Sequence, residues 1–411
     1  MTASDSRAVP VFGPGDRRAL VAVATQFFVN GALFASFFPR LPEIRDKVDI
    51  TVDQVGLFLS IAGICGLLSS AVVGRVIGRF GTRWVMAGGA AVVSLSLPVI
   101  GFARSVPVLV IGLIGMLAFD VFVDVAMNMQ GSWLSARRHT PVMSRLHGLW
   151  SLGTVAGGLS ASRIAAAGVP LSVHLSGAAA ILLVAVVFVS RGTLRNDQAP
   201  VEAVASDRRS RPGGQRWALA LFVLAGLSAS AVEATSIDWA AFRFADDYGS
   251  SAGFAALGYV AVTAGMTVGR FGGDWVDARL GSVRLGWVSA LLSGGGLAAA
   301  TLIAVETVNL VGYFVAGVGV ASLLPAIYDR AAKHPGRPGA GLGALTAGLR
   351  VAGVTLPVLV GALAATTLSV GAAIALVTLP SVMIFTLVTR LLPAPGTYTG
   401  ATPVAAHQTS N

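Results

Sequence analysis

The stretch WVMAGGAAVVSLSLPVIGFA, residues 84–103, is twenty residues long and contains no charged side chain. An α-helix of about 20 apolar residues is enough to cross a bilayer core about 30 Å thick. In lipid every backbone amide must be bonded within the protein, which only helices and closed barrels achieve. The run is continuous and does not alternate in polarity, so it predicts a membrane-spanning helix.

Eleven further runs of this kind follow one another along the chain, so the fold is expected to be an all-α integral membrane protein with twelve transmembrane helices. The twelve runs cover residues 18–38, 52–73, 84–103, 107–134, 143–168, 170–190, 216–241, 251–272, 283–304, 307–328, 340–364 and 368–391. The first run is longer than the apolar core of a signal peptide and lacks a clear cleavage site, so we interpret it as an uncleaved helix.

Composition supports this class and excludes others. Charged residues make up 12% of the 411 residues, and hydrophobic residues 55%, whereas soluble domains average about 25% charged. A soluble enzyme, a disordered chain and a disulfide scaffold are therefore excluded, and Cys65 is the single cysteine. The net charge of +10 does not indicate nucleic acid, because the basic residues lie in short gaps between apolar runs.

The distribution of basic residues predicts the orientation in the membrane. Of the 29 Lys and Arg residues, 22 lie on the same side as the N-terminus and six lie on the opposite side. Cytoplasmic loops carry the excess of Lys and Arg. An even number of helices places both termini together, so we expect both in the cytoplasm and the protein in the inner membrane as a multi-pass protein.

The longest polar gap divides the chain into two halves of six helices. Residues 191–215, RGTLRNDQAPVEAVASDRRSRPGGQ, are charged and lack apolar periodicity, which is typical of a linker. We expect five parts: a cytoplasmic tail, an N-terminal bundle, a cytoplasmic linker, a C-terminal bundle and a second cytoplasmic tail. They cover residues 1–17, 18–190, 191–215, 216–391 and 392–411.

A repeated motif indicates that the two halves are related by pseudo-symmetry. Residues 74–83 read GRVIGRFGTR after the second run, and residues 269–281 read GRFGGDWVDARLG after the eighth. Both place Gly and Arg in a tight turn at matching points of each half. Parallel repeats of six helices about an axis along the membrane normal are an architecture of secondary transporters.

These turns resemble the signature of the major facilitator superfamily between its second and third helices. The first copy has Gly78 where the family has Asp, while the second keeps Asp277 and Arg279. The resemblance covers essentially the whole chain and implies a transporter fold, with no enzymatic activity. It also implies that the turn residues control gating; these are Arg75, Arg79, Gly81, Asp277 and Arg279.

A narrower resemblance points to the rhizopine-transporter-like, or MosC-like, branch of that superfamily. It rests on DVAMNMQG at residues 124–131, MSRLHGLWSLG at 143–153 and PRLPEIR at 39–45. Glu233 and the Asp238-Trp239 pair also fit it. The resemblance supports functional roles for Asp124 and Asn128 in particular.

Asp120, Asp124 and Asn128 follow one another at four-residue spacing in the fourth run. This spacing places them on one face of a helix, and a charged stripe is expected to face a central cavity and not lipid. Two adjacent carboxylates in a low-dielectric setting favour proton binding by one of them. We expect Asp124, and secondarily Asp120, to carry protons; the alternative is a structural bond to a neighbouring helix.

Three more ionisable residues fall inside predicted spans. Glu233 is expected to be buried in the seventh run and to couple protons, whereas Asp238 lies nearer the surface and is a candidate substrate-binding or outer-gate residue. They are five residues apart and should differ in direction by about 140°. Arg350 needs a carboxylate partner or a water-filled cavity, and a guanidinium can also bind an anionic substrate group. Its available partners are Asp120, Asp124 and Glu233.

Uncharged polar residues complete the predicted site. Gln26 and Asn30 share a helical face and are candidates for binding a polar solute or for bonding helices together. Asn128 and Trp150 are predicted to shape the same pocket. His147, at the start of the fifth run, is a candidate gate or proton relay.

The sequence therefore predicts a secondary active transporter that moves a small solute by alternating access, with proton coupling and either uptake or efflux. Its expected partners are the solute, protons and the lipid bilayer, and it is expected to act as a monomer. No nucleotide-binding loop, zinc cluster or nucleophile–base set is recognisable, so no cofactor, no metal and no enzymatic activity are expected. The alternative is a polytopic membrane protein that does not transport, such as a receptor or scaffold.

Overall fold

The computed structural model describes residues 12–138, 140, 142–195, 216–332, 334 and 339–392, and within these ranges it contains helices and no strand. The helices of the first half are α1 (Pro14–Phe37), the short η1 (Phe38–Arg40), α2 (Leu41–Val48), α3 (Val52–Phe102), α4 (Val106–Arg138), α5 (Met143–Ala166) and α6 (Leu171–Gly192). Those of the second half are α7 (Arg216–Tyr248), α8 (Ala252–Leu280), α9 (Ser282–Leu302), α10 (Glu306–Val320), α11 (Leu323–Ala332), α12 (Ala340–Ala364) and α13 (Val370–Leu391).

The helices agree with an all-α membrane protein. Within the described ranges, nine helical segments are long and apolar enough to cross a membrane. One of them is the 51-residue α3, which holds two of the predicted runs in a single element. α5 is outside this set, and α10 is a shorter apolar helix.

α3 changes direction at one residue. Gly81 has φ 81° and ψ 152°, a combination that is essentially restricted to glycine. Gly281, between α8 and α9, has φ 78° and ψ 152°. The repeat seen in the sequence therefore extends to the backbone, since both copies of the motif turn on a glycine in the same conformation.

Gly281→Ala should destabilise the protein. No heavy atom lies within 4 Å of a Cβ added at Gly281, so the cost comes from the positive φ alone and is of order 1–3 kcal/mol. Gly286→Ala in α9 is the matched control, because its Cβ also meets nothing within 4 Å and its backbone is helical. There the change should stabilise by about 0.5–1 kcal/mol. Thermal unfolding of the two purified variants measures both effects, and equal midpoints would contradict the strain argument.

Several helix boundaries differ from the sequence predictions. The predicted run 307–328 forms two helices, α10 and α11, separated at residues 321–322. α8 continues to Leu280 instead of ending at residue 272, and α1 begins at Pro14. The linker beyond residue 195 and the tails at 1–11 and 393–411 lie outside the described residues.

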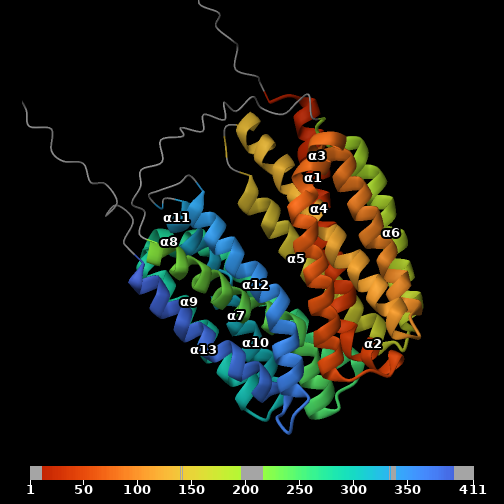
Figure 1. Ribbon diagram of the computed structural model, residues 1–411, viewed down its shortest axis with the longest axis vertical. Helices are drawn as coiled ribbons and strands as arrows, with labels where there is room; N and C mark the ends of the chain where they lie inside the picture. The colour runs from red at the N-terminus through yellow and green to blue at the C-terminus, as the bar shows by residue number, and fades with distance from the viewer. Residues whose placement is uncertain are drawn as a thin grey trace, which may run out of the picture.

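The two halves form two helical bundles that meet at one end of the molecule (Figure 1). The bundles converge at the end where α2 lies, and they diverge at the end where α1 begins and α13 ends. We call these the α2 end and the Gly81 end. The halves are joined by an ion pair between Arg45 and Asp246, with a distance of 2.5 Å between Nη1 and Oδ2. The Ser162 hydroxyl also donates to the carbonyl of Gly253 across the two halves at 2.7 Å.

Each bundle is fastened internally at the α2 end by a buried arginine. Arg40 donates to the carboxylate of Glu43 and contacts Nδ1 of His174 in α6 at 3.1 Å. Arg243 pairs with Asp247, which accepts hydrogen bonds from the backbone amides at the start of α13. In the first half, therefore, η1 at the end of α1 is tied to α6, and in the second half α7 is tied to α13.

Candidate functional site

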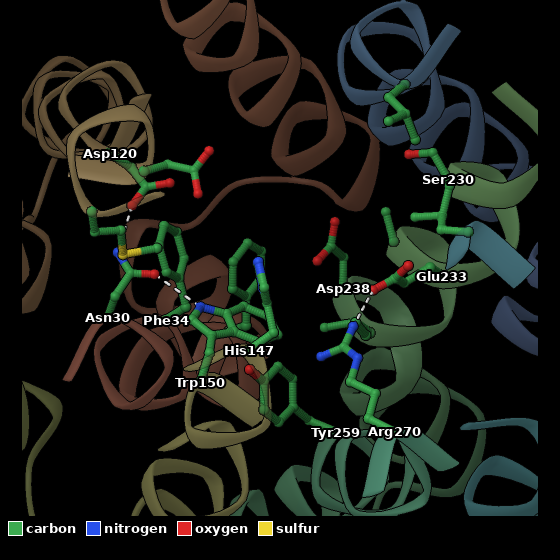
Figure 2. Close-up of a pocket in the computed structure, with 17 residues that line it drawn as sticks. Asn30, Phe34, Asp120, His147, Trp150, Ser230, Glu233, Asp238, Tyr259 and Arg270 are labelled. Atoms are coloured by element: carbon green, nitrogen blue, oxygen red, sulfur yellow. Dashed lines mark hydrogen bonds and ion pairs between the residues drawn. The ribbon is translucent and has the colours of Figure 1, made fainter. Parts of the chain in front are cut away.

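A cavity of about 410 Å³ lies where the two bundles meet. α1, α4 and α5 of the first half supply Asn30, Asp120, Asp124, His147 and Trp150, and α7 and α8 of the second half supply Ser230, Glu233, Asp238, Tyr259 and Arg270. Figure 2 shows the labelled residues of the two halves on opposite sides of this space, apart from Tyr259, which lies near Trp150. The site is thus shared between the two bundles.

Glycines bring α1 and α5 together and so place two of these side chains. A Cβ added at Gly31 would lie 2.1 Å from the carbonyl oxygen of Trp150, and one at Gly153 would lie 2.1 Å from that of Phe28. Small residues allow two helix backbones to approach this closely. The close approach brings Asn30 of α1 within hydrogen-bond distance of Trp150 on α5.

A chain of hydrogen bonds runs across the first half of the site. The indole Nε1 of Trp150 donates to Oδ1 of Asn30 at 2.9 Å, and Nδ2 of Asn30 donates to Oδ1 of Asp120 at 2.7 Å. Both bonds are drawn in Figure 2. Asn30 is only 5% exposed, and both atoms of its amide are used, Nδ2 in holding the carboxylate and Oδ1 in holding the indole.

Asp124 is one helical turn from Asp120 and is exposed to the cavity. Its carboxylate accepts a hydrogen bond of 2.9 Å from Nδ2 of Asn128, which also bonds the backbone carbonyl of Asp124. The arginine of α12, Arg350, acts on it electrostatically. The three residues of the predicted stripe therefore belong to one site, with Asn128 positioning Asp124 although it does not itself line the cavity.

Arg270 is the central cation of the cavity, and sequence reasoning missed it. Its Nη2 lies 3.1 Å from Oε1 of Glu233, its Nη1 donates to the Ser151 hydroxyl at 2.5 Å, and its guanidinium carbon lies 5.4 Å from the centroid of the Trp150 ring. Arg270 and Glu233 belong to the second half, whereas Ser151 and Trp150 belong to the first. In the sequence Arg270 belongs to the second copy of the repeated motif, which predicts a tight turn, whereas in the structure it lies inside α8.

Asp238 connects the main cavity to a second one. It lines the 410 Å³ cavity and a neighbouring cavity of about 260 Å³, which also contains Arg350 and lies between α3, α4 and α12. Both Glu233 and Asp238 face the main cavity despite their five-residue spacing, because the cavity is wide enough to be reached from two directions of α7.

Arg350 lies in the second cavity without a carboxylate partner at ion-pair distance. Among the described residues, no pair within 4.0 Å joins it to Asp120, Asp124 or Glu233. Glu233, which was one of its expected partners, pairs with Arg270 instead. Of the two situations expected for Arg350, the structure therefore favours a cavity position over a direct ion pair.

The remaining predicted residues lie in different places. Gln26 is 2% exposed and does not line the cavity, and its Oε1 has no hydrogen-bond partner among the described residues. His147 lines the cavity, with its ring 5.2 Å from that of Phe27. The other predicted gating residues, those of the two turns, lie at the Gly81 end and do not line the cavity. Four of them are exposed: Arg75, Arg79, Asp277 and Arg279.

The charges of the cavity suit the binding of a proton or a polar solute. Four carboxylates face it, and one of them is paired with a cation. Within the described parts of the chain, no three metal-ligating side chains lie together.

The geometry can be compared with known proteins. A sequence profile of the Major Facilitator Superfamily matches residues 23–357. The chain belongs to this superfamily. This superfamily member is therefore a multi-pass membrane protein from a group of transporters that carry small molecules. Neither the superfamily nor the relatives of this chain indicate enzymatic activity.

Relatives of this superfamily member include two proteins from rhizobia. It is 28% identical over 317 residues to an uncharacterized transporter, y4wD, of Sinorhizobium fredii, with 75% of this chain and 81% of that protein covered. It is 27% identical over 338 residues to the membrane protein MosC of Rhizobium meliloti, with 80% of each chain covered. The MosC-like resemblance of the sequence motifs is thereby confirmed.

The fold of this superfamily member also matches solved structures. A crystal structure of a mutant of the nucleoside transporter NupG superimposes with a TM-score of 0.68 at 13% identity, covering 91% of this chain and 99% of that one. At this identity the match concerns the fold alone.

Proposed function

We propose that this protein is a secondary active transporter that moves a small polar solute by alternating access and couples this movement to protons. The observation that carries the proposal is the cavity between the two bundles, with carboxylates supplied by both α4 and α7. A solute bound there contacts both halves at once, so a rotation of the halves exposes it to either side of the membrane.

The proposed topology has twelve crossings with both termini in the cytoplasm. It counts α3 as two crossings separated at Gly81, counts α5 as one, and counts α10 with α11 as one. The excess of arginine in the gaps on the N-terminal side supports this orientation. The Gly81 end is then cytoplasmic, and the conformation described above is open toward the cytoplasm.

In the proposed mechanism, Asp124 binds and releases the proton. Asp120 and Glu233 modulate the affinity of Asp124 for the proton through their own charges. Asn30, Trp150 and Asp238 contact the solute, and Arg350 balances charge in the adjoining cavity. Because protonation removes a negative charge from the site, it alters the relative stability of the two arrangements of the halves. The arginines of the two turns and His147 are proposed to act in closing the cytoplasmic side.

Access to the cavity from both sides of the membrane tests the proposal. In a variant with Cys65 replaced by Ser, Ser230→Cys places a thiol in the cavity. It should react with a membrane-impermeant maleimide from either side, in proportions that change with a pH gradient. Ser293→Cys in α9 is the control, since Ser293 is fully buried and should stay unlabelled. Labelling from one side only, under every gradient, would instead support a receptor or scaffold.

A second experiment identifies the solute and the direction of transport. A strain that lacks the gene is grown on a panel of polar solutes as sole carbon or nitrogen source and is exposed in parallel to toxic compounds. Loss of growth on one solute identifies uptake, whereas greater sensitivity to a compound identifies efflux.

A further inference from the structure

Arginines at the two ends of the molecule are held differently. At the α2 end, Arg40, Arg45 and Arg243 each pair with a carboxylate. At the Gly81 end, Arg79 and Arg279 are exposed, and each has its guanidinium over an aromatic ring. Arg45 and Arg243 also lie over rings, and Arg137 at the Gly81 end pairs with Asp16, so the difference concerns Arg79 and Arg279 in particular. These two have no carboxylate partner in the described chain, which suggests that they have a partner outside the protein.

The arginine–aromatic pairs flank both copies of the repeated turn. At the first copy, Arg79 lies over Phe80 and Arg83 lies over Trp84, each with 5.5 Å between the guanidinium carbon and the ring centroid. We call these four residues the Gly81 surface. The Nε of Arg83 is a buried donor with no hydrogen-bond partner among the described residues.

Two arginine–aromatic pairs also lie near the second copy, with closer contacts and a different spacing in the sequence. Arg279 lies 3.6 Å from the centroid of the Trp275 ring, and Arg390 of α13 lies 3.9 Å from that of Trp287 in α9. We call these four residues the Gly281 surface. Within the described chain, none of the four arginines of the two surfaces forms an ion pair with a carboxylate.

The aromatic rings of both surfaces face outward. Phe80, Trp84, Trp275 and Trp287 are 58%, 65%, 62% and 43% exposed. Tryptophan is enriched at the level of lipid headgroups, where its ring lies partly among acyl chains and its polar edge faces water. An arginine stacked on such a ring is held at the same depth as the lipid phosphates.

The stacking also leaves the arginine able to bind phosphate. A cation–π contact uses the face of the guanidinium, while its N–H donors lie in the plane and point outward from the edge. Two of these donors match two oxygens of a phosphate group. An arginine paired with a carboxylate has these donors occupied, as in the pairs of the α2 end.

We propose that the Gly81 surface and the Gly281 surface each bind the headgroup of an anionic phospholipid through stacked arginines and exposed aromatic rings. The two sites lie beside Gly81, inside α3, and Gly281, between α8 and α9, and in each of them an arginine stands two residues before the glycine, Arg79 and Arg279. This inference does not depend on the solute or on proton coupling.

Native mass spectrometry of the purified full-length protein tests this inference. Delipidated protein in detergent is titrated with phosphatidylglycerol or phosphatidylcholine, and the bound lipids are counted. The protein should prefer phosphatidylglycerol. The double variants R79Q/R83Q and R279Q/R390Q should each weaken its binding by about fivefold for each arginine removed.

Controls separate the sites from general charge effects and from misfolding. R104Q/R163Q removes two exposed arginines of the α2 end that stack on no ring in the described structure, and it should leave phosphatidylglycerol binding unchanged. R79K/R83K keeps the positive charges, and with them the excess of basic residues that orients the chain in the membrane, but it loses the planar guanidinium donors. It should therefore still lose part of the preference for phosphatidylglycerol over phosphatidylcholine. Equal loss in the R104Q/R163Q control, or full retention in the glutamine variants, would overturn the proposal. Displacement of the lipid by millimolar inorganic phosphate would instead assign the surfaces to free phosphate.

Discussion

Asp124→Asn should abolish proton-driven accumulation of the solute in proteoliposomes. A gradient of one pH unit corresponds to about 1.36 kcal/mol, which sustains a concentration ratio of about ten when one proton moves with each solute. Asparagine keeps the size of the side chain and the contact with Asn128 but cannot bind a proton. The accumulation ratio should therefore fall to about one, while equilibration of the solute across the membrane continues. The measurement is uptake or release of the identified solute under an imposed pH gradient.

The same assay distinguishes Asp124 from the other carboxylates. Asp53→Asn removes a carboxylate near the start of α3 that lines neither cavity, and it should leave the ratio near ten. Asp120→Asn keeps an oxygen that can accept from Asn30 but removes the negative charge, which weakens that hydrogen bond, so it should alter solute affinity in addition to coupling. If Asp124→Asn and Glu233→Gln both retain full accumulation, the assignment of proton coupling to these residues is wrong.

Arg270→Gln should produce the largest loss of stability among single changes in the cavity. The guanidinium is 24% exposed and its partner Glu233 is 20% exposed, so removing the cation leaves a carboxylate with little solvent around it. Loss of one partner of such a pair costs about 1–3 kcal/mol, less than for a fully buried pair. Contacts with Ser151 and Trp150 of the other half are lost as well. Thermal unfolding of the purified protein measures the change.

A double-mutant cycle isolates the contribution of the pair. Glu233→Gln combined with Arg270→Gln should cost less than the sum of the two single changes, with a coupling of about 0.5–3 kcal/mol. Exchanging the charges, with Glu233→Arg and Arg270→Glu, should restore part of the stability. Arg279→Gln is the matched control on the same helix, because Arg279 is exposed and forms no ion pair in the described chain. Additive single changes would show that the two side chains do not stabilise one another.

Much of the fold could be predicted from the sequence because the bilayer imposes a simple rule. Long apolar runs must be helical in lipid, and the all-α class follows from run length alone. The repeated turns at Gly81 and Gly281 were also recognisable, because the backbone at each of these two positions adopts a conformation that favours glycine. Where each helix ends was less predictable, since α8 continues through Gly272 and Gly273 despite the low helix propensity of glycine.

The candidate site was only partly predictable, because some of its contacts join residues that are far apart in the sequence. The four-residue spacing of Asp120 and Asp124 determines a shared face without any tertiary information. The partner of Glu233, in contrast, depends on how α7 and α8 pack, and the arginine chosen from the sequence, Arg350, lies instead in the adjoining cavity. Gln26 shares a face with Asn30, yet it packs inside the bundle, because one helix turn is enough to leave the edge of a cavity.

In the proposed alternating access, the contact between Arg45 and Asp246 bears on how readily the bundles exchange between two arrangements. Its side chains are 17% and 22% exposed, and ion pairs this accessible to water are worth about 1 kcal/mol or less. Such a pair can favour one population over the other by about fivefold at most. In that proposal the ion pair alone is a weak bias between the two arrangements, and a difference of about fivefold in solute affinity between them is enough to offset it.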